Sequence, residues 1–307
     1  MRRDEMTASP SVNTHNLKMI TAMTLAGSIG IFVVESGQSA SVVVFYRCLI
    51  GGMTLLLYGI ARHRADFAKI TVRSLILMAF SGVTMAANWV LFFMAYAHAS
   101  ISMVPTVYHM YPFALIVGAA LIFHEKLSPR SICWAMVAFF GVALVAIGSG
   151  SAMSTTGLGL TLAAMVCYTA TLLITKQLSA TPAGLYSAVQ LLVGAVVILP
   201  LVGADALAVD AGSANYLLII GILHTAITYV LLYGAVQSLG SSRIAILSFL
   251  YPMTALVFDL TIYNVRPDLL QIAGICAIVL AVLGERLHPF RHLMHRRSNA
   301  GRHGTQG

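Results

Sequence analysis

Two histidines of this chain lie in the middle of long apolar runs, where an ionisable side chain is unusual. His109 stands in the run VYHMYPFALIVG, which begins at Val107, and His224 stands near the middle of the run 214–236. Neutral imidazole is cheaper to bury than a carboxylate, and its ordinary pKa of about 6.5 suits proton transfer. Each histidine could therefore carry a coupling proton or hydrogen-bond a substrate. The alternative is a structural histidine that is bonded to a neighbouring helix.

Three charged residues belong with these histidines: Arg47, Glu35 and Asp259. A charge at the centre of a bilayer costs at least about 2.5–3.5 kcal/mol on insertion scales, so such residues are candidates for function. The guanidinium of Arg47 could hold a substrate carboxylate through two parallel hydrogen bonds. It could equally form an ion pair with Glu35, or extend to the membrane surface. Asp259 could bind a cation or a proton, or pair with Arg266.

A further group of residues combines flat aromatic faces with hydrogen-bonding groups. Such faces stack on rings and attract amines by cation–π contact. Tyrosines near the end of a span are often anchors at the membrane surface, but Trp89, Tyr111 and Tyr229 lie too deep for that role. The predicted substrate-binding residues are Asn88, Trp89, Tyr108, His109, Tyr111, Tyr168, Gln190, His224 and Tyr229.

Pro112 and Pro252 lie within two of the apolar runs, each directly after a tyrosine. Proline removes a backbone donor and clashes with the preceding turn, so we expect a helix kink at each position. Kinks are tolerated inside a membrane where the freed carbonyls face protein or a water-filled cavity. These two could bend during function or serve only as fixed kinks.

The composition determines the kind of solvent in which these residues lie. Hydrophobic residues make up 59% of the chain and charged residues only 9%, and the mean hydropathy is +0.87. A soluble domain has about 25% charged residues, so this chain cannot build a water-facing surface and its solvent is lipid. Four cysteines lie in apolar runs without C-x-x-C spacing, which indicates buried thiols.

A bilayer core about 30 Å thick requires about 20 apolar residues per helix. The sequence predicts an all-α membrane protein with ten transmembrane helices. They are expected at 17–34, 42–61, 72–96, 101–123, 131–148, 157–176, 184–203, 214–236, 242–263 and 269–287.

The basic residues test this number of spans. With ten spans, all but two of the 18 Lys and Arg residues fall on the side that holds both termini; the exceptions are Arg47, within a span, and Arg266. By the positive-inside rule that side is the cytoplasm. We expect a multi-pass protein of a bacterial inner membrane, with both termini cytoplasmic. The net charge of +8 is thus explained by the membrane rather than by nucleic acid.

The chain contains an internal repeat. Tyr111-Pro112 recurs 140 residues later as Tyr251-Pro252, and Trp89 then aligns with Tyr229. Because each half holds five spans, the second half must enter the membrane from the opposite side, and a substrate site is expected between the halves. The repeat does not match the histidines: His109 aligns with Phe249 and His224 with Thr84.

The predicted parts of the chain follow from the repeat. They are a cytoplasmic leader at 1–16, a first five-helix repeat at 17–148, a second, inverted repeat at 157–287, and a basic cytoplasmic tail at 288–307.

Several short motifs carry a resemblance to a known family. Phe45-Tyr-Arg47, Glu125-Lys-Leu127 and Gln271-Ile-Ala-Gly274, together with the two five-span halves, resemble the EamA branch of the drug/metabolite transporter superfamily. The resemblance covers nearly the whole chain. It implies a ten-helix bundle with a central cavity, often used to export amino acids, their derivatives or other metabolites.

The expected function is therefore secondary active transport of a small organic metabolite by alternating access. Export is favoured by the resemblance, and proton coupling is expected through His109, His224 or Asp259. Alternatives within transport are an importer of a vitamin-like metabolite and a multidrug exporter. From another class, the alternative is a non-transporting scaffold or sensor. We expect no enzyme activity, cofactor or metal, a small-molecule substrate and lipid as partners, and a monomer or homodimer.

Overall fold

The computed structural model describes residues 12–62, 64–67, 69–95, 97–98, 103–126, 128–147, 153–203, 209–262 and 268–286. Every regular element in these ranges is a helix. In chain order they are α1 (Val12–Glu35), α2 (Ala40–Arg62), α3 (Arg64–Phe67), α4 (Val72–Ala95), α5 (Met103–Tyr108), α6 (Tyr111–Phe123), α7 (Pro129–Ile147), α8 (Thr155–Gln177), α9 (Ala183–Val202), α10 (Ala211–Gly221), the π-helical turn η2 (Ile222–Ile227), α11 (Thr228–Val236), α12 (Ser241–Ser248), α13 (Leu250–Ile262) and α14 (Leu269–Arg286).

Six helical segments of the described chain are long and apolar enough to cross a membrane. They are Asn13–Glu35, Ala40–Arg62, Val72–Ala95, Thr155–Gln177, Ala183–Val202 and Ala211–Val236. Shorter apolar helices lie at Tyr111–Phe123, Pro129–Leu144 and Ile272–Ala281. The chain is therefore an integral membrane protein that crosses the bilayer several times.

Two of the predicted spans differ from the expectation, because each is built from two helices. The run 101–123 is divided into α5 and α6 by a turn at His109 and Met110, and the run 242–263 is divided into α12 and α13 at Phe249. Both divisions stand just before a Tyr-Pro pair, so they lie at equivalent places in the two halves.

The prolines begin the second helix of each pair rather than bending one continuous helix. Pro112 stands in the first turn of α6, where the missing N–H has no helical acceptor and the fixed φ suits a helix start. The turn before it is closed by tight backbone bonds, from Met110 N to the Val107 carbonyl at 3.0 Å and from Phe113 N to the Met110 carbonyl at 3.0 Å. At Pro112, where a kink was expected, the structure thus has a short hydrogen-bonded turn between two helices.

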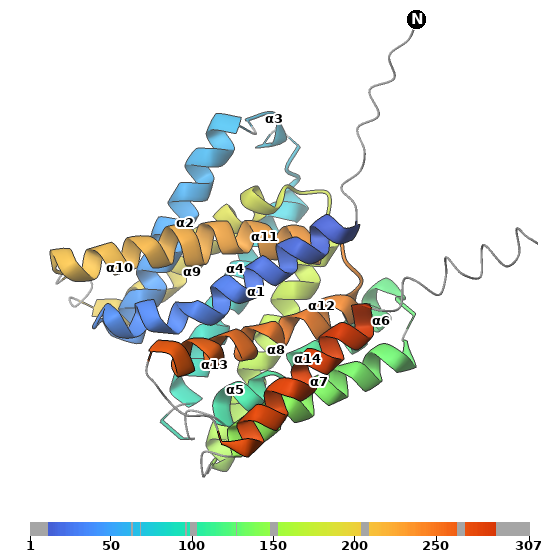
Figure 1. Cartoon of the computed structure of the whole chain (residues 1–307). Helices are drawn as coiled ribbons and strands as arrows, with labels where there is room; N and C mark the ends of the chain where they lie inside the picture. Colours follow the sequence, from blue (N-terminus) through green and yellow to red (C-terminus); the bar gives the residue numbers. More distant parts are fainter. Residues whose placement is uncertain are drawn as a thin grey trace, which may run out of the picture.

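Close helix packing depends on small residues at the crossing points. A Cβ placed on Gly82 of α4 would lie 2.6 Å from the Gln190 carbonyl oxygen of α9, so only glycine allows this approach. A Cβ on Gly141 of α7 would lie 2.7 Å from the Gly274 carbonyl oxygen of α14. Figure 1 shows α7 and α14 side by side at one edge of the bundle, and α1 beside α11.

Candidate functional site

Arg47 joins three helices in the interior of the bundle. Its guanidinium carbon lies 4.7 Å from the ring centroid of Trp89 on α4, which is a cation–π contact. Its Nε donates a hydrogen bond of 3.3 Å to Thr225 Oγ1 in η2. Glu35, the expected ion-pair partner, is exposed at the end of α1, and among the described side chains it makes no ion pair with Arg47. The guanidinium is therefore held by an aromatic face and a hydroxyl.

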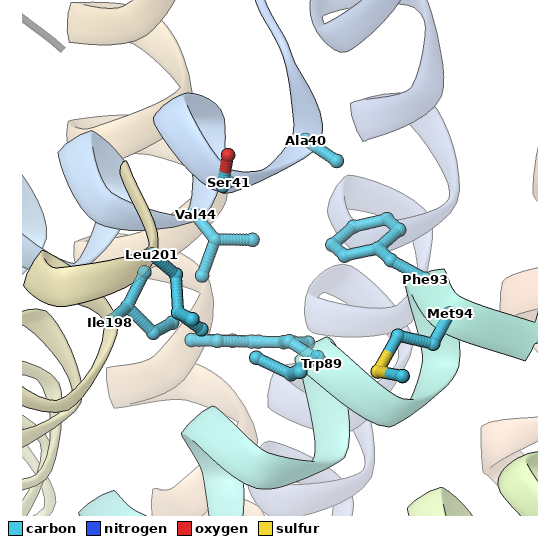
Figure 2. A pocket seen from close by; sticks show the side chains of 9 residues that line it. Ala40, Ser41, Val44, Trp89, Phe93, Met94, Ile198 and Leu201 are labelled. Carbon is cyan, nitrogen blue, oxygen red and sulfur yellow. The ribbon is translucent and has the colours of Figure 1, made fainter. Parts of the chain in front are cut away.

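A pocket of about 340 Å³ lies beside Trp89. Its walls come from the first turns of α2 and the last turns of α4 and α9, including Val44, Phe93, Ile198 and Leu201 (Figure 2). Small-molecule sites commonly measure about 300–1,000 Å³, so the pocket is large enough for a small metabolite. Since Trp89 lines the pocket and also contacts Arg47, the pocket and the cation are connected through one ring.

An aromatic cluster fills the space between the two halves; we define it as Tyr108, His109, Tyr111, Tyr168, Phe249 and Tyr251. The rings of Tyr111 and Tyr168 meet edge to face at 4.8 Å. The ring of His109 stacks on that of Tyr251 at 5.6 Å with an interplanar angle of 24°. The ring centroids of Phe249 and His109 are 6.3 Å apart, so the two residues that align in the repeat are neighbours in the structure. The helix interruptions of both halves therefore contribute side chains to one cluster.

Two further tyrosines extend from this region along α11. The rings of Tyr229 and Tyr233 stack at 5.1 Å and 4°, and Tyr233 meets Tyr186 of α9 edge to face at 5.1 Å. These three tyrosines therefore form a second group of contacting rings, on α9 and α11.

Gln190 belongs to a buried polar network that ties α4, α8 and α9 together. Its Nε2 donates to Ser81 Oγ at 2.8 Å, and Ser81 in turn bonds the hydroxyl of Tyr186. Thr175 Oγ1 donates to the same hydroxyl at 2.9 Å. The sequence predicted Gln190 as a substrate-binding residue, and it gave no prediction for Ser81, Thr175 and Tyr186. The sequence signal for a polar network was the spacing of Ser81, Thr84 and Asn88, which places these three residues on one face of α4.

On that face, Asn88 lies one turn beyond Thr84 and two turns beyond Ser81, and it is 2% exposed. Its Nδ2 makes a weak contact of 3.8 Å with Met85 Sδ, and its Oδ1 has no partner among the described residues. A buried carbonyl oxygen without a donor is uncommon and expensive. The position is therefore suited to a donor that arrives from outside the chain.

His224 lies in the π-helical turn η2 and is 2% exposed. Its Nδ1 is 2.9 Å from the Leu25 carbonyl oxygen of α1, and its ring centroid is 4.6 Å from that of Phe32. The structure thus places His109 and His224 on different partners: the first in the aromatic cluster, the second against α1. The side chain of Asp259 and the whole of Arg266 lie outside the described residues.

A salt bridge that the sequence did not predict lies at one end of the helices α6 and α8. Lys176 Nζ, at the end of α8, lies 2.6 Å from Glu125 Oε1 and donates to the Leu239 carbonyl at 2.9 Å. Glu125 Oε2 accepts from Ser241 N at 3.1 Å. We call these contacts the Glu125–Lys176 clasp. Glu125 follows α6 of the first half, whereas its two partners, Lys176 and Ser241, belong to the second half, so the clasp joins the halves.

The electrostatics of the clasp favour its charged form. Partial burial raises the pKa of the Glu125 carboxyl, but the hydrogen bonds from Lys176 and Ser241 and the charge of Lys176 outweigh burial and lower the pKa below its usual value. Glu125 is therefore ionised, and the pair is a true ion pair at neutral pH.

A bundle of long apolar helices that keeps a cation, imidazoles and tyrosine hydroxyls in its interior is the architecture of a membrane transport protein. The chain belongs to the EamA-like transporter family, whose sequence profile matches it twice, at residues 14–147 and 155–284. This confirms the resemblance to the drug/metabolite transporter superfamily. Two consecutive matches also fit the predicted inverted repeat, and they make the chain a transporter rather than an enzyme.

Two individual proteins are similar over most of their length. An "Uncharacterized transporter YxxF" of Bacillus subtilis (strain 168) is 28% identical over 284 residues, which cover 91% of each chain. A solved structure described only as "Crystal structure of protein" matches with a TM-score of 0.74 at 14% identity, over 87% of this chain and 95% of that chain. At that identity the second likeness shows the fold alone.

Proposed function

We propose that the chain is a secondary active transporter of a small organic metabolite that works by alternating access. It would cross the membrane ten times as two inverted repeats, at 17–148 and 157–287, with both termini in the cytoplasm of a bacterial inner membrane. The observation that carries this proposal is the position of Arg47. It contacts Trp89 of the first half and Thr225 of the second, which fits a substrate site between two halves that move relative to each other.

The side chains of this site favour an amino acid or a related compound. A guanidinium binds a carboxylate through two parallel hydrogen bonds. Tyrosine faces bind an amine or stack on a ring. Arg47 supplies the first group, and Tyr108, Tyr168 and Tyr251 supply the second. The direction we propose is export, as the family resemblance implies.

The two ends of the bundle differ, which supports a site that opens to one side of the membrane at a time. The pocket beside Trp89 is formed by the helix ends that the positive-inside rule places at the outer face. The polar network around Tyr186 and the Glu125–Lys176 clasp lie toward the other end. We infer that this conformation is closed to the cytoplasm. The sequence offers three candidates for proton coupling, His109, His224 and Asp259, and the contacts of His224 bear on the choice among them.

One observation favours a second candidate, a multidrug exporter. Most residues of the pocket beside Trp89 are apolar, among them Phe93, Met94 and Leu201. A pocket of this kind accepts hydrophobic molecules with little regard to their polar groups. An importer of a vitamin-like metabolite has no such observation in its favour.

A two-stage experiment tests the proposal. Purified protein is first screened for thermal stabilisation by amino acids, vitamins and common drugs, because a ligand that binds the folded state raises the melting temperature. Each stabilising compound is then followed by counterflow in proteoliposomes, with and without an imposed pH gradient. Stabilisation and counterflow by amino acids support the proposal, and preference for apolar drugs supports the second candidate. Absence of counterflow with every compound contradicts both, and a rate indifferent to the gradient contradicts proton coupling.

A further inference from the structure

His224 occupies an irregular turn that is stabilised by its neighbours. The helix from Ala211 to Val236 passes through a π-helical turn at Ile222–Ile227. Thr225 Oγ1 donates to the Ile220 carbonyl at 2.8 Å and Thr228 Oγ1 to the Leu223 carbonyl at 2.9 Å, each five residues back. π-Helical turns inside α-helices occur frequently at functional sites. This turn places His224 against α1 and Thr225 against Arg47.

The hydrogen bond to α1 fixes which ring nitrogen carries the proton. A carbonyl oxygen can only accept, and Nδ1 lies 2.9 Å from the Leu25 carbonyl oxygen, so Nδ1 is the donor. In the neutral ring Nε2 then carries a lone pair and can only accept. No described atom hydrogen-bonds to Nε2, although it is buried.

The surroundings of the ring oppose a second proton. A positive charge lies next to this turn, because Arg47 on α2 bonds Thr225, the residue that follows His224. From α1, the uncharged ring of Phe32 lies 4.6 Å from the imidazole between ring centroids, so it supplies no counter-charge. A proton on Nε2 would place a second positive charge beside Arg47 in a region with little water, and no carboxylate among the described residues is paired with it.

A purely structural histidine would leave this arrangement unexplained. The tie to α1 uses Nδ1 alone, and an asparagine could make the same bond. A buried acceptor without a donor is destabilising by about 1–3 kcal/mol. Such a group is retained most readily where another molecule supplies the donor. The guanidinium of Arg47 lies beside the same turn, so donor and acceptor groups of the protein are next to one another.

We propose that Nε2 of His224 accepts a hydrogen bond from an N–H or O–H group of the transported molecule, and that His224 carries no coupling proton. This proposal rests on the proposed transport function. It makes His224 a specificity-determining residue: molecules without a donor next to the group that Arg47 holds would bind weakly. It also leaves His109 and Asp259 as the candidates for proton coupling.

The first test is chemical and requires no knowledge of the substrate. Diethyl pyrocarbonate acylates the unprotonated nitrogen of imidazole, and it is applied to the protein in proteoliposomes at about pH 7, just above the usual imidazole pKa. Peptide mass spectrometry then follows His224, with the exposed His98 as the positive control. We expect His224 to be labelled, because the site must open during transport. If His98 is labelled and His224 is not, the proposal is wrong.

The second test reads the proton directly. Protein with ¹⁵N-labelled histidine is examined by NMR at about pH 7, and the His224 signals are assigned by their loss in His224→Asn and in His224→Gln. We expect a protonated Nδ1 and a bare Nε2. The opposite tautomer or a doubly protonated ring would overturn the proposal. Counterflow by the wild-type protein is measured separately, so either failure removes the role of His224 without removing the transport function.

Discussion

Glu125→Gln should open the end of the transporter that we propose to face the cytoplasm, because it removes the charge that joins the two halves. The side chain of Glu125 is 30% exposed and that of Lys176 is 14% exposed, so the pair is neither fully buried nor fully solvated. Exposed ion pairs contribute about 0–1 kcal/mol, and removal of one partner of a buried pair costs about 3–5 kcal/mol. An intermediate value of about 2 kcal/mol corresponds to a shift of about 30-fold in the conformational equilibrium.

The assay is cysteine labelling from the cytoplasmic side. Ser248 is fully buried at the end of α12, and Ser248→Cys is introduced into a variant whose four native cysteines are replaced. Inside-out vesicles are then treated with a membrane-impermeant maleimide. If the clasp controls access, Glu125→Gln raises the labelling rate by about 30-fold, within a factor of several.

The matched control removes a negative charge from an ion pair that lies within the first half. Asp66→Asn breaks the pair with Lys69 at 2.8 Å, in which the lysine side chain is 75% exposed. This variant should label at the rate of the parent. Equal rates for Glu125→Gln, Asp66→Asn and the parent would refute the assignment of the clasp as a cytoplasmic gate.

Three further results are expected. Because the pKa of Glu125 is lowered in the closed conformation, the clasp should stabilise that conformation fully above the ordinary value of 4.5. The ratio of the Ser248→Cys labelling rates with and without Glu125→Gln, in which the pH dependence of the thiolate cancels, should therefore stay constant above that value and approach one only as the pH falls through the lowered pKa. His224→Gln should keep counterflow of a compound found in the screen, because its amide reaches the place of Nε2. His224→Asn should lose counterflow by about tenfold, the effect of one hydrogen bond. An equal loss in both variants would argue for a structural or titrating role of His224. Gly82→Ala should lower the free energy of unfolding by about 1–3 kcal/mol in a denaturant titration, since its Cβ would lie 2.6 Å from the Gln190 carbonyl oxygen, and Gly30→Ala, with no atom within 4 Å, should not.

Hydropathy predicted the apolar part of each helix better than the residues at which the helix begins and ends. The first span was expected from residue 17, but α1 begins at Val12, because a helix can continue through polar residues beyond the lipid. The interruptions at His109 and Phe249 were invisible for the opposite reason: a turn made of apolar residues has the same hydropathy as a helix. The prolines marked the place, but they could not show that each begins a new helix.

The contacts of the site depend on which helices meet, and that information is not contained in local patterns. From the sequence, the partner considered for Arg47 was Glu35, which lies in the preceding helix. The structure instead brings Trp89 and Thr225 to Arg47 from distant segments. The Glu125–Lys176 clasp likewise requires residues from three separated parts of the chain. In contrast, depth within an apolar run did identify Trp89, Tyr111 and His109 as interior residues, because burial in a membrane follows distance from the ends of a span.

Counterflow by Arg47→Gln tests the central claim most directly. The compound is one that stabilises the wild-type protein, and the matched control is Arg73→Gln, which neutralises an exposed arginine at the start of α4. If Arg47 anchors the substrate, Arg47→Gln should lose counterflow by at least about tenfold, as expected for one charge-assisted hydrogen bond, and should still fold. Arg73→Gln should transport like the wild type. Wild-type counterflow in folded Arg47→Gln would contradict a substrate site built on Arg47.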